Sequence, residues 1–272
     1  MKFFSYLFAL SSFSLTQAFT VRIAALLVTD DPANGLPSAI SALEGYGIPY
    51  DILDFSRNVT DLPLEDSKGG KYSVIVFTNG VPKNIQAGQV ALLDAYEAKY
   101  GARRVGKTLF FTWITNSSGL NTSPVIVKGV SLSGECCANI AEDTLLSFDP
   151  KVVDFTDSNI KADATLSAKG LYHYRVKIND TSVSPVVLAN PTKDPIAVWK
   201  RFPNNRNEMH FFIAFGDFSL TSSVLHHVWI SWAFRRMYPG IRRTYLNTQV
   251  DDLFLETNTV SFFSWFLKKL SQ

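Results

Sequence analysis

The sequence predicts an α/β fold: a parallel sheet of the Rossmann or flavodoxin type, followed by a β-rich part. Two observations support this prediction. Up to residue 115, apolar runs and helical segments follow the order strand, helix, strand, strand, helix, strand, which is typical of a parallel α/β sheet. From residue 116 onward, short apolar runs are separated by clusters of Asn, Ser, Thr and Gly, as in strands joined by turns.

The elements of the first part, residues 19–115, can be placed in order. Residues 21–28 are mostly apolar, as expected of a strand in a sheet that is covered on both faces. A helix is expected over 36–46, because apolar residues share one face and Gly47 follows the last turn. The other expected elements are strands at 50–55, 72–77 and 105–114 and a helix at 85–100.

The second part, residues 116–239, is expected to form strands and one closing helix. The helix covers 222–238 and ends before Pro239 and Gly240. The strands either form a small sandwich or extend the first sheet. The apolar runs that predict them are 125–130, 152–155, 171–178, 183–188, 196–199 and 210–215.

The loop after the first strand, residues 29–35, argues against a nucleotide site. It holds one glycine and two carboxylates, Asp30 and Asp31, whereas a phosphate-binding loop needs several glycines and no negative charge facing the phosphates. These two acids could bind a cation or hydroxyl groups, or they could be solvated loop residues.

Residues 1–18 predict export from the cell, so the protein is expected outside the cell or in a cell wall. Lys2 precedes an apolar run, and the run ends in the small-x-small cleavage sequence of residues 16–18. The run is too short to span a membrane. A net charge of +2 without a basic block gives no reason to expect nucleic acid as a partner. Four glycosylation sequons agree with secretion; they begin at Asn58, Asn116, Asn121 and Asn179.

The two cysteines, Cys136 and Cys137, are neighbours in the chain. Adjacent Cα atoms lie about 3.8 Å apart, which is below the usual range for a disulfide. A strained vicinal disulfide, two free thiols and bonds to cysteines that are missing from this chain all remain open.

The strand-like run 244–250 ends in two adjacent acids, Asp251 and Asp252. Adjacent strand residues point to opposite faces, so two acids can serve one site only where a strand ends. In barrel enzymes, catalytic groups lie at the carboxyl ends of the strands. The pair is therefore the candidate catalytic feature, with two solvated acids at a strand end as the simpler alternative.

Residues 242–257, RRTYLNTQVDDLFLET, resemble the first catalytic motif of the fungal secreted galactosaminogalactan deacetylases, which are relatives of the polysaccharide deacetylases. The resemblance covers residues 19 to about 258. It implies a carbohydrate-binding region before a (β/α) deacetylase barrel that starts within 240–258. It also implies that Asp251 is the general base, that Asp252 binds a divalent, zinc-like metal, and that the substrate is a polysaccharide carrying N-acetylgalactosamine.

The chain departs from that family in its histidines. The family supplies two metal ligands from a later His-x-x-x-His motif, but the histidines here are His173, His210, His226 and His227, and no two are four apart. We therefore expect no complete metal site in this chain and no activity of its own. Residues 259–272 are expected to be an aberrant hydrophobic tail of a truncated protein, with a short membrane anchor as the rival interpretation. The alternative function is a free-standing extracellular glycan-binding or adhesive protein without catalysis.

Aromatic side chains on the β-rich part are the candidates for sugar contact, because a ring can stack on the C–H face of a pyranose. Most such rings belong to a core instead. The candidates are Trp113, Tyr172, Tyr174 and Trp199.

Overall fold

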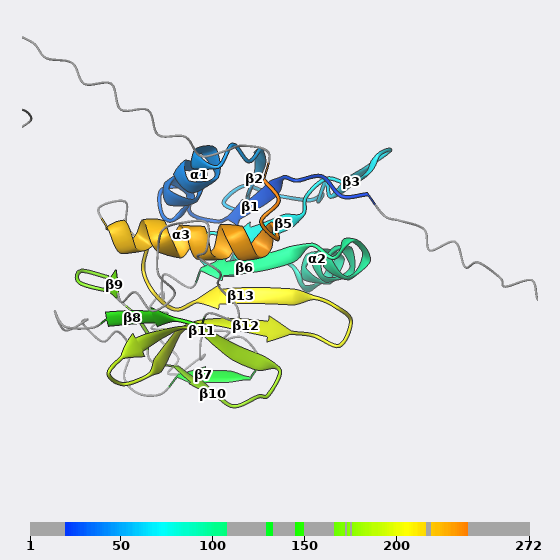
Figure 1. Cartoon of the computed structure of the whole chain (residues 1–272). Coiled ribbons are helices and arrows are strands. Elements are labelled where there is room, and N and C mark those ends of the chain that lie inside the picture. The colour runs from blue at the N-terminus through cyan, green and yellow to red at the C-terminus, as the bar shows by residue number, and fades with distance from the viewer. Residues whose placement is uncertain are drawn as a thin grey trace, which may run out of the picture. The chain divides into compact units, whose positions relative to one another are not determined.

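The computed structural model describes residues 20–107, 129–132, 145–149, 166–171, 173–174, 176–215 and 219–238. All of them belong to one compact unit, Met1–Ile241, and the second unit, Arg242–Gln272, lies outside the described residues. The main feature of the first unit is a nine-stranded mixed sheet with the order β2-β1-β5-β6-β13-β12-β11-β8-β9 (Figure 1).

One half of this sheet is parallel, as the sequence predicts. Each strand in it pairs in parallel with its neighbours, and β13 joins from a position about 100 residues later in the chain. The strands are β2 (Tyr50–Asp54), β1 (Ala25–Thr29), β5 (Val74–Phe77), β6 (Arg103–Lys107) and β13 (Asn207–Phe211).

The other half is antiparallel and continues directly from β13. Of the two alternatives for the β-rich part, the structure therefore shows an extension of the first sheet. Its strands are β12 (Asp194–Arg201), β11 (Val183–Asn190), β8 (Leu145–Phe148) and β9 (Leu166–Ser167). Two short antiparallel pairs lie outside this sheet: β10 (Val176–Ile178) with β7 (Val130–Leu132), and β3 (Glu65–Asp66) with β4 (Gly69–Gly70).

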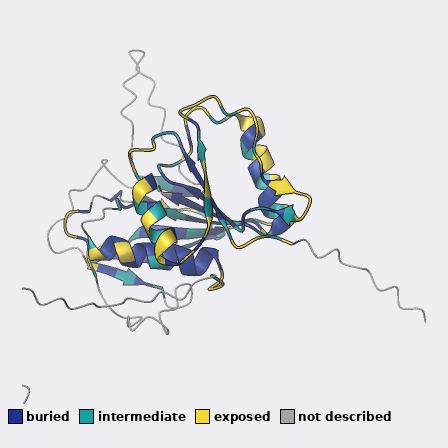
Figure 2. Ribbon diagram, turned by 90° about the horizontal axis from the view of Figure 1, so that it is seen from above, coloured by how far each residue is buried: buried dark blue, intermediate teal, exposed yellow. Residues whose placement is uncertain are grey.

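Helices cover both faces of the parallel half. Ala25 and Leu27 pack with α1 (Leu36–Gly45) and α3 (Leu220–Ala233), whereas Leu26 and Val28 pack with α2 (Ala87–Tyr100). Successive strand residues point to opposite faces, so an uninterrupted apolar β1 needs cover on both sides. Figure 2 shows the central strands mostly buried and α1 and α2 exposing their outer sides, whereas α3 is buried along most of its length. None of the helices in the described ranges has the length and apolarity that crossing a membrane requires.

Several predicted boundaries are wrong; for example, the strand predicted over 171–178 begins only at Val176. The first strand begins at Ala25, four residues later than predicted, and Val21 makes only an isolated bridge to Gly70. The last helix ends at Ala233 instead of residue 238, because Arg235 and Arg236 have φ angles of 51° and 60°. These left-handed conformations end an α-helix before the chain reaches Pro239.

Gly35 brings the start of α1 close to the end of β5. It is the N-cap of α1 with a φ of 71°, a conformation that suits glycine. A Cβ atom at this position would lie 2.4 Å from Asn79 Oδ1 and 2.6 Å from the Thr78 carbonyl oxygen. The carboxyl edge of the parallel sheet is therefore closely packed at this point.

Candidate functional site

Most of the predicted site residues lie outside the described residues. This holds for Asp251 and Asp252, for the aromatic candidates Trp113 and Tyr172, for the sequons at Asn116 and Asn121, and for Cys136 and Cys137. The sequons at Asn58 and Asn179 are described, and both asparagines are exposed, although the Asn179 amide donates to Ser131 Oγ.

The two described aromatic candidates have different surroundings. Tyr174 is 9% exposed and packs in a hydrophobic cluster that includes Val176 and Phe212, so its ring offers little surface to a sugar. Trp199 on β12 is only half-buried. Its position makes it the better candidate for contact with a ligand.

Neighbouring side chains hold the Trp199 ring in place. Its Nε1–H donates to Asn207 Oδ1 over 3.0 Å, and its ring meets the Trp232 ring edge-on, with the ring centroids 6.3 Å apart. The exposed Arg201 guanidinium lies 4.9 Å from the ring centroid, within the range of a cation–π contact. The Trp199 ring is thus held in place, and the exposed side chain of Arg201 lies beside it.

Arg103 connects this group to the C-terminal end of α3. Its guanidinium lies 4.8 Å from the Trp232 ring centroid and donates to the Trp232 carbonyl oxygen, which also accepts from the Arg235 backbone N–H over 3.2 Å. Burial and the neighbouring charge of Arg235 lower the pKa of Arg103 to about 10. Arg235 itself donates to the Gly101 carbonyl oxygen over 2.9 Å. Several arginines therefore converge beside the two tryptophans.

The acidic loop after β1 satisfies its carboxylates internally. Asp30 accepts from the backbone N–H of Lys83, and Asp31 accepts from the Ala33 backbone N–H and the Asn34 side-chain amide. These bonds stabilise the loop conformation, as Asx turns do. They favour the interpretation of Asp30 and Asp31 as structural loop residues.

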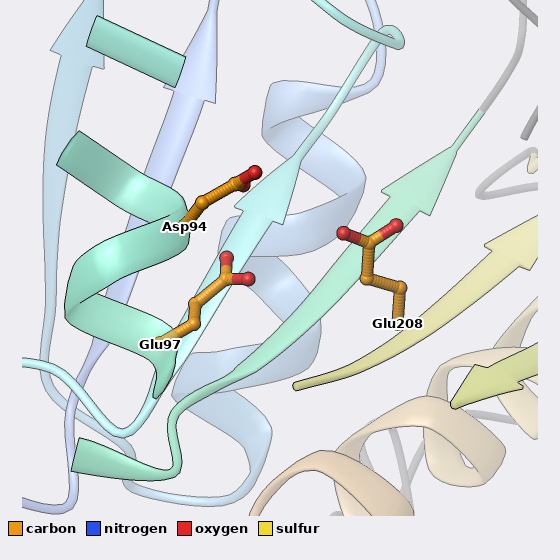
Figure 3. A group of neighbouring side chains, drawn as sticks. All are labelled: Asp94, Glu97 and Glu208. Carbon is orange, nitrogen blue, oxygen red and sulfur yellow. The ribbon is translucent and has the colours of Figure 1, made fainter. Parts of the chain in front are cut away.

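Three carboxylates outside the predicted site form a group with two arginines, in which Asp94 is half-exposed and the two glutamates are buried. Asp94, Glu97 and Glu208 come from α2 and β13 and point toward one another (Figure 3), and their oxygens lie within 4.8 Å of one another. Arg104 and Arg206 each pair with all three acids. The two guanidinium groups thus supply the positive charge that a metal ion would otherwise bring to these carboxylates. We therefore interpret the group as an ion network.

Burial affects the two glutamates of this network differently. For Glu97, burial raises the pKa to about 7 against the opposing charges of Arg104 and Arg206. Burial also opposes ionisation of Glu208, but the hydrogen bond and charge of His210 and the charges of both arginines outweigh it and hold its pKa at about 2. Glu97 is therefore the member of the network that takes up a proton near neutral pH.

We expect the stability of the protein to fall as the pH rises from about 5 to about 7.5, and to do so less in Glu97→Gln. The folded-state pKa of Glu97 lies above its ordinary value of 4.5. The stabilisation from its proton is therefore complete below pH 4.5 and is lost as the pH rises through about 7. Urea midpoints across this range measure the effect. Equal slopes for wild type and Glu97→Gln would contradict it, and Glu65→Gln on the surface is the control.

The two adjacent histidines of α3 join this helix to α1. Trp229 Nε1–H donates to His226 Nδ1 over 2.9 Å, so the neutral ring carries its hydrogen on Nε2 and donates it to Ser38 Oγ, 2.6 Å away. His226 therefore does not act as a base toward Ser38 in this arrangement. His227 is half-buried and bonds to the Tyr46 hydroxyl.

Comparison with known proteins identifies the family. A family model described as Agd3 CBM87, a carbohydrate-binding module, matches residues 21–232. The crystal structure of Agd3, a carbohydrate deacetylase, matches with a TM-score of 0.70 and 33% identity, over 86% of this chain and 36% of that chain. The chain thus spans about a third of the length of Agd3.

Two other solved structures share only 13% identity at a TM-score of 0.44. PurLQS from Thermotoga maritima matches over 79% of this chain and 100% of its own, and a glutamine amidotransferase from Methylobacillus flagellatus over 77% and 76%. A search of curated proteins gives no significant match. Since the family model covers residues 21–232 of 272, the chain belongs to the Agd3 CBM87 family of carbohydrate-binding modules.

Proposed function

We propose that residues 21–232 bind an extracellular polysaccharide, and that they are the glycan-binding region of a secreted fungal galactosaminogalactan deacetylase. The match of this whole stretch to the Agd3 CBM87 family carries the proposal. The likeness to the carbohydrate deacetylase Agd3 supports it. The polymer would be the one from which full-length relatives remove acetyl groups at N-acetylgalactosamine units.

In this proposal, Asp251 is the general base and Asp252 a ligand of a divalent, zinc-like metal. Such a metal would lower the pKa of a bound water and polarise the acetamide carbonyl, while Asp251 would accept the proton. The sequence offers no His-x-x-x-His motif for the remaining metal ligands, since no two of its histidines are four residues apart. We therefore propose no hydrolysis by this chain alone, and metal-dependent acetate release by the purified chain would contradict this.

Affinity electrophoresis tests the binding function. We expect the purified chain to migrate more slowly in a native gel that contains partly deacetylated galactosaminogalactan than in a gel without it, because bound polymer retards the protein. A gel containing a neutral glucan at the same concentration is the control for sieving. Equal migration in all three gels would rule out the proposed function.

A further inference from the structure

We propose that the module contacts sugar through the surface beside the C-terminal end of α3, and that this surface takes a neutral, N-acetylated sugar in preference to a positively charged amino sugar. The surface consists of Trp199, Arg201, Trp232, Arg103 and Arg235, and we call it the tryptophan–arginine surface. The inference rests on the proposed glycan-binding function and adds where the sugar binds and which sugar is preferred.

The first step is the platform. Trp199 is half-buried, and both its indole N–H and one edge of its ring are held, by Asn207 and Trp232. A rigid aromatic ring gives contact area at a low cost in conformational entropy. Arg201 lies over this ring but is exposed to solvent. Its guanidinium can therefore move aside for a pyranose and donate to the hydroxyl oxygens of that sugar.

The second step concerns hydrogen-bond donors. Trp232 Nε1 and Arg103 Nε are buried and have no hydrogen-bond partner among the residues that the structure describes, and Trp232 is only 7% exposed as a whole. Buried donors in folded proteins almost always have an acceptor, which can be a protein atom, a water or a ligand. Both groups only donate, so a ligand that reaches either of them must offer an acceptor, such as a hydroxyl oxygen or an acetamido carbonyl.

The third step is charge. Among the residues that the structure describes, Arg103, Arg201 and Arg235 form no ion pair with a carboxylate. The acid nearest to Asn207 in sequence is Glu208, and adjacent strand residues face opposite sides of the sheet. Glu208 is also paired with arginines of its own. The tryptophan–arginine surface is therefore positive and repels an ammonium group.

Together these features favour binding of the substrate of the proposed deacetylation over binding of its product. Removing an acetyl group turns a neutral acetamido sugar into an amine that is protonated at neutral pH. The acetamido sugar brings an acceptor oxygen and no charge, whereas the ammonium brings only donors and a positive charge. The module would thus hold the acetylated polymer and release the deacetylated one.

Titration calorimetry with two matched oligosaccharides tests this selectivity. We expect wild type to bind an oligomer of N-acetylgalactosamine at least about tenfold more tightly than the galactosamine oligomer of equal length at low salt. The difference should narrow at 0.5 M salt, because charges are screened within a few ångströms there. Equal affinities at low salt, or tighter binding of the amine, would overturn the selectivity.

Substitutions in the tryptophan–arginine surface test whether the sugar binds there. Trp199→Ala should weaken binding of the acetylated oligomer at least about tenfold, and Trp199→Phe should weaken it less, since a ring remains. The double variant Arg201→Glu/Arg235→Glu should reverse the preference toward the amine. Arg57→Glu is the matched control, because this arginine is exposed on a loop after β2 and pairs only with Asp54 among the described residues; it should leave both affinities unchanged.

Trp232→Phe separates a ligand-binding role from a structural one. The change removes the N–H and keeps a ring. Removing a buried donor that has no partner among the described residues relieves its desolvation cost, whereas the smaller ring leaves a small cavity. We therefore expect the affinity to fall several-fold while the melting temperature of the free protein changes little. An unchanged affinity would mean that the Trp232 Nε1–H donates only to water, and this result would overturn the role of Trp232 in binding. If wild type binds no glycan, the proposed function fails; if Trp199→Ala binds like wild type, only the tryptophan–arginine surface is wrong.

Discussion

Replacing Arg104 by methionine is expected to lower the free energy of unfolding by about 3–5 kcal/mol, the usual cost of removing one partner from a buried ion pair. The side chain of Arg104 is 7% exposed and lies 2.6 Å from Glu97, which is fully buried. It also lies 2.8 Å from Asp94 and 3.4 Å from Glu208. Methionine keeps the apolar volume but leaves buried carboxylates with Arg206 as their remaining guanidinium partner. Urea unfolding at a pH above the Glu97 pKa, where this carboxylate is ionised, measures the loss through tryptophan fluorescence.

A surface ion pair provides the control for this experiment. Lys99 and Glu65 are as close as the buried pairs, at 2.8 Å, but their side chains are 41% and 44% exposed. Water screens such pairs, and they contribute little to stability. Lys99→Met should therefore change the urea midpoint far less than Arg104→Met. If both substitutions had the same small effect, the network would not be a source of stability.

The order and type of the main elements could be predicted because they follow from local patterns. Continuous apolar residues in β1 and β5 and the glycines that end the first two helices can be recognised without tertiary structure. The position of β13 could not be predicted. It pairs in parallel with β6 across more than 100 residues, and nothing in either strand's own sequence specifies that partner.

The ion network was missed for the same reason. Arg104 and Glu97 are close in sequence, but Arg206 and Glu208 reach them only because β13 lies beside β6. A charge run such as Arg206-Asn207-Glu208 normally indicates an exposed segment. Only the sheet order reveals that both charged side chains are buried.

The tryptophan–arginine surface contains one of the aromatic candidates from the sequence. This residue is Trp199, and the structure places it at a half-buried position. Its neighbours Trp232 and Arg103 were not singled out, since a tryptophan in an apolar helix indicates a core residue. The signal that marks them is a pair of buried donors that have no partner among the described residues, which only a structure can reveal.

Replacing Trp229 by alanine is expected to lower the free energy of unfolding by about 3–5 kcal/mol, the cost found for large aromatic residues removed from a core. Trp229 is fully buried and belongs to the hydrophobic core between α3 and the sheet. The substitution also removes the donor to His226 Nδ1. His226 then loses the bond that fixes its hydrogen on Nε2, and the contact with Ser38 on α1 weakens. Urea midpoints of wild type and variant measure the total effect.

Trp229→Phe separates the two causes of this loss of stability, which are the lost apolar volume and the lost hydrogen bond to His226. Phenylalanine keeps most of the apolar volume but cannot donate to His226, so its cost reports the hydrogen bond together with a smaller cavity. We expect Trp229→Phe to cost well under half as much as Trp229→Ala, because the apolar volume dominates. Leu220→Ala at the start of α3 is the control, since Leu220 is 78% exposed and its removal leaves no cavity. A loss for Trp229→Ala no larger than that of Leu220→Ala would contradict the packing of α3 against the sheet. Because α3 also supplies Trp232, such a result would equally undermine the tryptophan–arginine surface.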